Sequence, residues 1–250
     1  MARDLTAIPT TPPDDADKAR ARKQAKAYAS VIGELTEQFA AVQTHALLVI
    51  FQGMDASGKD GAVRAAFGRS SPANLRVHGF KKPTELERRH DFLWRVHQRA
   101  PARGEVAIWN RSHYEDVLIQ RVRGWIDEET VDHRFEAINA FERNLQRDNH
   151  TIILKFLLHT SKEEQEAQLR ERLEERDKHY KHNPGDWEER ELWGDYMAAY
   201  NDVLARSEVP WTIVPTDKRW WRDYVVSKAV RDALEGLNMS WPELPEGSEP

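Results

Sequence analysis

Short apolar runs separated by amphipathic stretches recur along the chain and predict strands that alternate with helices. The clearest run, at 46–51, is continuous and partly β-branched, as is typical of a strand buried on both faces. Similar runs occupy 106–109, 152–158 and 211–214, and a weaker one occupies 75–77. Strands connected through helices form parallel sheets covered on both faces, so we predict an α/β fold.

Helices are predicted where apolar side chains recur every three or four positions. Residues 14–44 show this spacing, for example at Ile32, Leu35 and Phe39. A second helix is expected over 84–100. The apolar positions of the first helix would suit a contact with a second copy of the chain, and we expect a homo-oligomer, although packing into the core explains them equally well.

The two ends of the chain lack this periodicity. Residues 1–13 carry three prolines and little apolar content, so we expect a mobile arm. Residues 238–250 are rich in Pro, Glu, Gly and Ser, and we expect a tail there. A single domain is therefore predicted over 14–237.

Residues 161–190 are densely charged, with 17 charged side chains in that segment. Such a run is usually a solvated helix face. The pattern breaks near Pro184, which suits the first turn of a new helix, with Asn183 as its cap. We predict a charged helical hairpin that would act as a lid if one side of it faces a phosphate site.

Composition excludes several classes of protein. The chain has 250 residues, 37 basic and 42 acidic side chains, and a net charge of −5, which argues against a protein that coats nucleic acid by bulk charge. The absence of cysteine excludes disulfides and thiolate metal sites. No apolar stretch has the length of a membrane span or the character of a signal peptide. We expect a cytoplasmic protein with neither a membrane nor a nucleic acid as partner.

The strongest chemical signal follows the first strand, where GMDASGKDG at 53–61 matches the phosphate-binding loop G-x-x-x-x-G-K. Glycines let backbone N–H groups turn toward an anion, the next helix adds its positive end, and Lys59 adds a full charge. A glycine-rich turn that only caps a helix is the alternative. The predicted phosphate-binding residues of the loop are Gly53, Ala56, Ser57, Gly58, Lys59, Asp60 and Gly61.

One position of the loop departs from this pattern. The Ser or Thr that usually follows the lysine and holds Mg²⁺ is replaced by Asp60. A second carboxylate, Asp55, stands inside the loop, where phosphate would repel it unless a cation intervened. We therefore expect Asp55 to bind Mg²⁺ directly or through water.

A second polar cluster, NRSHYED at 110–116, follows the next strong strand. Ligands bind at the carboxyl ends of strands in open parallel sheets. A metal-binding Asp is typical at this place, and Asn110 stands there instead. Arg111 and Arg121 would neutralise phosphoryl charge, with surface ion pairs as the alternative. His113 is more typical of a structural hydrogen bond, because phosphoryl transfer needs little acid–base chemistry.

Residues 76–103 carry eight basic side chains against three acidic ones. Lys81 and Lys82 lie in the loop that enters the helix predicted at 84–100. An ordinary basic surface is one interpretation, and a track for a polyanion beside the phosphate loop is the other. The segment has too few aromatics for a single-strand nucleic-acid binder.

Taken together, these motifs resemble the second family of polyphosphate kinases, which move phosphoryl groups between inorganic polyphosphate and nucleotides. The resemblance covers about residues 40 to 236. It is carried by GMDASGKDG (53–61), FKKPT (80–84), HDFLWR (90–95), NRSHYEDV (110–117), ERLEERDKHYKHNPGD (171–186) and LWGDYMAAY (192–200).

The resemblance implies a three-layer α/β/α, thymidylate-kinase-like P-loop fold with a helical lid. It implies Mg²⁺, for which Mn²⁺ can substitute, and a polyphosphate channel lined by Lys and Arg. Its substrates would be inorganic polyphosphate and nucleoside mono- and diphosphates, with AMP converted to ADP and ADP to ATP, and with the reverse direction open.

The resemblance also assigns roles to individual residues. Catalytic roles fall to Asp55, Lys59, Arg111 and Arg121. Further phosphate-binding roles fall to Lys81, Lys82, Arg172, Lys178 and Lys181. Nucleotide-binding roles fall to Phe80, Pro83, Thr84, Arg95, Asn110, His113 and Glu115.

The chain departs from the family pattern at two positions. Many members carry Asp where Asn110 stands, and the Asn form resembles subgroups that accept nucleoside monophosphates and, in some cases, diphosphates. Arg176 replaces a frequent Pro in the lid. Two other functions fit the same loop: an ATP-dependent nucleoside monophosphate kinase, and a nucleotide-binding regulator without turnover.

Overall fold

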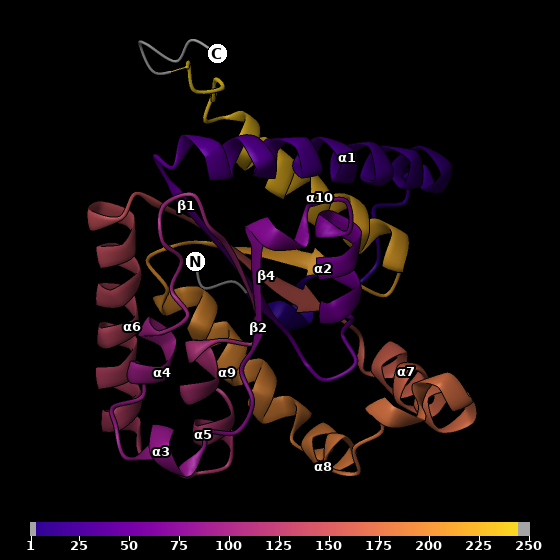
Figure 1. Ribbon diagram of the computed structural model, residues 1–250. Helices are drawn as coiled ribbons and strands as arrows, with labels where there is room; N and C mark the ends of the chain where they lie inside the picture. The colour runs from indigo at the N-terminus through magenta and orange to yellow at the C-terminus, as the bar shows by residue number, and fades with distance from the viewer. Residues whose placement is uncertain (1–3, 245–250) are drawn as a thin grey trace.

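The computed structural model describes residues 4–244 and forms a five-stranded parallel sheet between two layers of helices (Figure 1). The sheet order is β2-β3-β1-β4-β5. The strands are β1 Ala46–Gln52, β2 Leu75–Gly79, β3 Val106–Asn110, β4 Thr151–His159 and β5 Trp211–Pro215. Every apolar run that predicted a strand forms one, and the α/β prediction is confirmed.

Alternation along β1 explains the two layers of helices. Leu47, Val49 and Phe51 enter one apolar cluster, and Leu48 and Ile50 enter the other. The first cluster is covered by α1 Lys18–Val42, α2 Lys59–Phe67 and α10 Arg219–Glu235. The second is covered mainly by α6 Glu128–Asp148 and α9 Trp193–Arg206.

Helix α1 confirms the helix predicted at 14–44. Asp17 caps its start by accepting hydrogen bonds from the backbone N–H groups of Ala19 and Arg20. Ile32 and Phe39 are buried in the first cluster, so these apolar positions belong to the core of this chain. The homo-oligomer therefore stays a prediction.

The single helix predicted over 84–100 is wrong, because two short helices stand there: α3 Glu85–Arg88 and α4 Trp94–His97. Thr84 and Glu87 form a capping box that starts α3. The side chain of Asp91 then accepts a hydrogen bond from the N–H of Leu93 at 3.0 Å. Such a local bond competes with helical backbone pairing, which explains the interruption.

The mobile arm predicted at 1–13 is wrong for residues 4–13, which pack against the body of the protein. Leu5 is 1% exposed within the second cluster, and its N–H donates to Asn201 Oδ1 at 2.9 Å. The ring of His159 bonds the carbonyl of Ile8 at 3.0 Å. Residues 1–3 lie outside the described part of the chain. Of the expected tail, 238–244 carry no helix or strand, and 245–250 lie outside the described residues.

The charged segment forms helices that project from the body beside the carboxyl edge of the sheet (Figure 1). They are α7 Lys162–Glu174, the 3₁₀ turn η4 Arg176–Lys181 and α8 Gly185–Glu191. Gln165 fixes the base of α7 by donating to the carbonyl of Asp55 at 3.1 Å, which joins the hairpin to the phosphate loop.

The remaining elements are short connections. They are η1 Leu5–Ala7, η2 Pro72–Asn74, η3 His113–Asp116 and α5 Ile119–Val122. Within residues 4–244, no helix combines the length and the hydropathy that a membrane crossing requires.

Candidate active site

The sheet topology opens a crevice beyond β1 and β3. These strands are neighbours, with Phe51 opposite Asn110. The chain leaves β1 into α2 on one face of the sheet, and it leaves β3 toward α6 on the opposite face. The two loops therefore diverge, and ligands in open parallel sheets bind where this happens.

The loop at 53–61 wraps tightly around the end of β1. Gly53 and Gly58 have φ angles of +148° and +90°, which other residues rarely adopt. A Cβ at Gly53 would also lie 2.6 Å from the carbonyl oxygen of Leu158. These glycines allow the tight turn at the start of α2 in which backbone N–H groups would face an anion, as the predicted phosphate loop requires.

Lys59 folds back over this loop. Its Nζ donates to the carbonyl oxygens of Gly53 and Met54 at 2.7 and 3.0 Å. Burial, aided by the nearby Arg111, lowers the pKa of Lys59 to about 8. The ammonium is held by two carbonyl dipoles alone, so a phosphate oxygen is a stronger partner for it.

Arg222 supports the loop from behind. Its Nη1 donates to the carbonyl of Gly58 at 3.1 Å, and it pairs with Asp223 at 2.6 Å. A Cβ at Gly61 would lie 2.7 Å from Nη2 of Arg222. The second and third glycines of the motif therefore make room for this guanidinium.

An ion pair joins the two strand-end loops. Arg111 adopts a left-handed conformation with φ +63°, and its guanidinium bonds the carboxylate of Asp55. Burial acts to raise the pKa of Asp55, but the charges of Arg111 and Lys59 outweigh it and hold that pKa below its usual value. Glu115 lies 3.8 Å from Arg111 and, together with Asp55, raises the pKa of Arg111.

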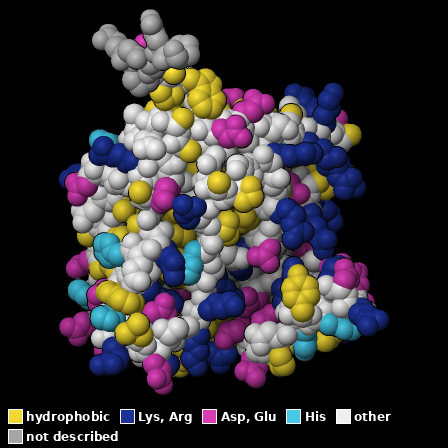
Figure 2. Space-filling view, in the orientation of Figure 1, with side chains coloured by type: hydrophobic (Ala, Val, Ile, Leu, Met, Phe, Trp, Pro, Cys, Tyr) yellow, Lys and Arg dark blue, Asp and Glu magenta, His cyan; other side chains and the backbone are white. Residues whose placement is uncertain are grey.

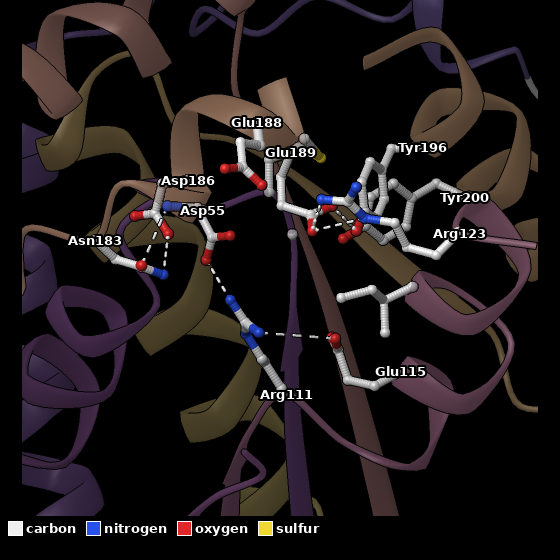
Figure 3. A pocket seen from close by; sticks show the side chains of 14 residues that line it. Asp55, Arg111, Glu115, Arg123, Asn183, Asp186, Glu188, Glu189, Tyr196 and Tyr200 are labelled. Carbon is white, nitrogen blue, oxygen red and sulfur yellow. Dashed lines mark hydrogen bonds and ion pairs between the residues drawn. The ribbon is translucent and has the colours of Figure 1, made fainter. Parts of the chain in front are cut away.

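Two hollows meet at this pair. The acidic hollow has a volume of about 190 Å³ and contains five carboxylates (Figure 3). They are Asp55, Glu115, Asp186, Glu188 and Glu189. Arg123, Asn183, Tyr196 and Tyr200 also line it.

The basic hollow, on the other side of the pair, has a volume of about 460 Å³. Eight cations line it: Lys59, Arg64, Arg111, Arg172, Lys178, Lys181, Arg219 and Arg222. Three carboxylates accompany them: Asp55, Asp60 and Glu171. Asp55 and Arg111 line both hollows and thus stand at their junction.

The helical hairpin at 162–191 brings the cations predicted for a lid to the basic hollow, and here each is paired with an acid. Arg172 bonds Asp186 at 2.6 Å, and Lys178 bonds Glu171 at 2.6 Å. Lys181 lies 3.8 Å from Asp60, the loop residue that replaces Ser or Thr. Asp60 also accepts a hydrogen bond from the Asn110 amide at 2.6 Å, which ties the two strand-end loops together.

Several predicted nucleotide-binding residues serve the fold instead. Phe80 lines neither hollow and packs edge-on against Trp109, so its ring does not face a ligand site. Thr84 caps α3. Arg95 is 8% exposed and donates to the carbonyl of Lys81 at 2.8 Å. The exposed Lys81 and Lys82 line neither hollow, nor does Pro83, because these residues follow the edge strand β2.

His113 cannot contact a nucleotide, because its side chain is fully buried. It lies 3.3 Å from Glu142, which bonds the buried ammonium of Lys155 at 2.7 Å. Lys155 also donates to the hydroxyl of Tyr114 at 2.6 Å. This network fixes η3, the turn that places Glu115. It fits the structural hydrogen bond expected for His113 and contradicts the nucleotide-binding role.

Arg121 lies away from both hollows. It pairs with Glu128 and with Asp202, each at 2.6 Å, so the surface ion pair weighed against its catalytic role is what the structure shows. Arg123, two residues on, lines the acidic hollow and pairs with Glu189 at 2.6 Å. Arg121 lies in the four-residue helix α5 and Arg123 caps its end, and this difference decides which arginine faces the hollow. No spacing in the sequence predicts it.

The sequence analysis also did not predict several other lining residues. Tyr196, Tyr200 and Asp186 lie in segments that carry the family resemblance, but no spacing within those segments marks these three positions as lining residues. Arg219 and Arg222 had one signal: two cations stand in the first turn of α10, where the helix dipole favours acids.

The junction suits a divalent cation. Among residues 4–244, no three His, Asp or Glu side chains form a ready-made metal cluster. Mg²⁺, however, commonly takes one or two carboxylates and obtains its other oxygens from phosphates and water. Burial and the charge of Asp55 raise the pKa of Asp186, so these two carboxylates repel each other across the acidic hollow. A cation between them would remove that repulsion.

The chain is similar to a family of known proteins over almost all of its length. Residues 15–241 match the family model described as polyphosphate kinase 2 (PPK2). An AMP/ADP-polyphosphate phosphotransferase of Meiothermus ruber is 42% identical, over 95% of this chain and 91% of the relative. An ADP-polyphosphate phosphotransferase of Rhodopseudomonas palustris is 38% identical, over 85% of this chain and 78% of the relative. The crystal structure of polyphosphate kinase 2 from Arthrobacter aurescens superposes with a TM-score of 0.92 at 38% identity, covering 96% of this chain and 88% of that one.

Proposed function

The chain belongs to the polyphosphate kinase 2 family, and from this premise we propose that it transfers a phosphoryl group from inorganic polyphosphate to AMP and to ADP, with Mg²⁺. The observation that carries the proposal is the junction of the two hollows. Asp55 and Arg111 are shared by a hollow lined with cations and a hollow lined with carboxylates and tyrosines. A phosphoryl group that moves between two ligands must pass such a point.

The basic hollow would hold the donor. Polyphosphate carries a charge on each phosphate, and eight cations line this space. The backbone N–H groups of the loop and Lys59 would grip the terminal phosphates. Arg172 and Lys181 would exchange their present carboxylate partners for phosphate oxygens as the donor enters, which would draw the lid over it.

The acidic hollow would take the acceptor nucleotide. Tyr196 and Tyr200 offer apolar rings, and Asn183 and Glu188 offer hydrogen-bonding groups. Arg123 would face the acceptor phosphate if it released Glu189. The hollow's present volume of about 190 Å³ is small for a nucleotide, so binding requires the hairpin to move outward.

Transfer needs positioning and charge neutralisation rather than a strong base. The acceptor phosphate oxygen is already ionised at neutral pH, so no proton has to be removed. Arg111 stands between donor and acceptor and would stabilise the equatorial oxygens of the moving group. Lys59 would hold charge on the leaving phosphate.

Asp55 and Asp186 are the residues that would hold Mg²⁺, and we expect Mn²⁺ to substitute for it. When bound, the ion would neutralise charge on the phosphates that flank the transferred group. Asp55 would be released for this role if Arg111 turned from it toward phosphate.

The proposal is tested with purified protein, Mg²⁺, AMP and long-chain polyphosphate, without ATP, while AMP, ADP and ATP are resolved over time. ADP followed by ATP is expected. Asp55→Ala and Lys59→Ala should each lose most of kcat, whereas Lys228→Ala, on the exposed side of α10, should match the wild type. Turnover that requires ATP as donor would move the protein to the nucleoside monophosphate kinases. Saturable nucleotide binding with no product from any donor would indicate a regulator.

A further inference from the structure

A third hollow lies beside the basic one, between the amino-terminal half of α1, α2 and the start of α10. Its volume is about 850 Å³, larger than either hollow of the active site. We call it the outer groove. Six cations line it against the single carboxylate of Asp223: Arg22, Lys23, Lys26, Arg64, Arg69 and Arg219. Figure 2 shows Lys and Arg side chains gathered on the side of the molecule where these helices meet.

The outer groove is continuous with the basic hollow. Arg64 of α2 and Arg219 of α10 line both spaces. The cations of the outer groove therefore extend the charged surface around Lys59 toward α1. The lining positions of α1 run from Ala19 to Ala29, about 15 Å along a helix.

The cations of α1 have no structural partner that explains them. Within residues 4–244, Arg22, Lys23 and Lys26 make no ion pair and no side-chain hydrogen bond, and all are exposed. Among the same described residues, Arg64 and Arg69 make no ion pair either. These side chains are available to a ligand.

The charge order of α1 opposes its own dipole. Five cations and no acid lie between Lys18 and Lys26, and its acids, Glu34 and Glu37, lie in the carboxyl half. Helix dipoles favour the reverse order by about 0.3–1 kcal/mol for each charge in the first or last turn, which here concerns Lys18 and Arg20. Further along, the groove cations Arg22, Lys23 and Lys26 have no acid in the same half of α1 to neutralise them.

We propose that the outer groove is a second section of the donor site, which binds the part of an inorganic polyphosphate chain that lies beyond the basic hollow. The inference rests on the proposed function and adds the path of the donor to it. A linear chain of phosphates carries a charge on each unit and fits a groove lined by six cations. A single-stranded nucleic acid fits less well, because Trp220 is the one aromatic side chain in the lining and base stacking uses several.

The groove implies selection by chain length. Tripolyphosphate can fill the basic hollow but leaves the outer groove empty, whereas a long chain occupies both. The wild type should therefore have a higher kcat/KM for long chains, expressed mainly in KM, because the groove binds donor without touching the transferred group.

The test compares two triple variants of equal charge change. Arg22→Ala/Lys23→Ala/Lys26→Ala removes the α1 cations of the groove. Arg20→Ala/Arg147→Ala/Lys228→Ala removes three exposed cations that line none of the three hollows. AMP phosphorylation is measured with tripolyphosphate and with long-chain polyphosphate at one ionic strength. Binding of long-chain polyphosphate is measured directly on the same proteins.

The groove variant should lose about tenfold or more in kcat/KM for long chains, with kcat maintained, and its preference for long over short donors should shrink. The control variant should keep the wild-type preference. Equal behaviour of the two variants, or a wild type that treats both donors alike, would overturn the outer groove while leaving the proposed function standing.

Two further outcomes separate the remaining cases. A wild type that turns over neither donor would overturn the proposed function, and the binding measurement would then decide the groove by itself: equal affinity of the two variants for long-chain polyphosphate refutes it. A groove variant that loses affinity for a single-stranded RNA oligonucleotide but keeps long-chain kinetics would assign the groove to nucleic acid and refute the proposal.

Discussion

Raising the pH should inactivate this protein by deprotonating Lys59, at a lower pH than the one at which the protein unfolds. In the free protein, Lys59 is 9% exposed, and its ammonium is held by two carbonyl oxygens. Burial lowers its pKa to about 8, from an ordinary value of 10.5. Because the donor phosphates need the charged form, the encounter with polyphosphate should follow this titration.

The magnitude follows from that pKa. Lys59 is about 90% charged at pH 7 and about 10% charged at pH 9, so kcat/KM for polyphosphate should fall about tenfold over this interval. Bound phosphate favours the ammonium and raises its pKa, so the alkaline fall of kcat should occur at higher pH. The two profiles should therefore separate, and the separation reports the phosphate contact.

Stability should move in the opposite direction. Lys59 and Lys155 both have a pKa lowered to about 8 in the folded protein, from 10.5. The unfolded chain binds their protons more tightly, so burial of these two charged groups lowers the free energy of unfolding by its full amount below pH 8, and this loss disappears as the pH rises toward 10.5. The contribution of the two lysines to stability therefore rises between pH 8 and 10, and their titration cannot unfold the protein.

The assay is a pH series of initial rates with polyphosphate varied at saturating AMP, with Tm measured at each pH. Lys59→Arg is the control, because a guanidinium stays charged throughout, and its residual activity should lack the fall near pH 8. A wild-type kcat/KM that is flat from pH 7 to 9 would refute the reasoning. A fall that persists unchanged in Lys59→Arg would assign it to another group.

Three further predictions concern the supports of the site. Gly61→Ala should lower kcat at least tenfold, because the new Cβ displaces Arg222, while the Tm holds or rises, because alanine favours the helix. Both kcat and Tm are measured on one preparation. Arg121→Ala should keep turnover within about threefold and cost about 1 kcal/mol or less in urea unfolding, since it breaks exposed ion pairs. Glu142→Gln should cost about 3 kcal/mol by leaving buried Lys155 without its carboxylate, and adding Lys155→Met should restore most of that loss.

The sheet and the phosphate loop were predictable because their signals are local. A strand buried on both faces needs a continuous apolar run, and 46–51 is one. A loop that surrounds phosphate needs glycines and a lysine at fixed spacing, and 53–61 supplies both. The single helix predicted at 84–100 is wrong because the prediction used apolar spacing alone. The side chain of Asp91 hydrogen-bonds the backbone locally and interrupts the helix, and apolar spacing does not contain that information.

The membership of the hollows was less predictable, because it depends on where short elements point. Arg121 and Arg123 share α5 or its end, yet one pairs with α6 and α9 and the other lines the acidic hollow. Phe80 and His113 belong to motifs that identify the family, and both are buried. A motif can thus be a reliable sign of the family even where its side chains hold the fold rather than the substrate.

Charges that oppose a helix dipole were a further signal that periodicity does not contain. Among the described helices of nine or more residues, four of six carry an acid in the first turn, for example Glu128 in α6 and Glu163 in α7. Helices α1 and α10 have no acid in the first turn, and both begin with cations. These two helices are distant in sequence, yet they contribute cations to the same groove. Cations of two helices that are distant in sequence converge in space beside a phosphate loop, and a shared anionic ligand explains this convergence better than the folding of either helix does.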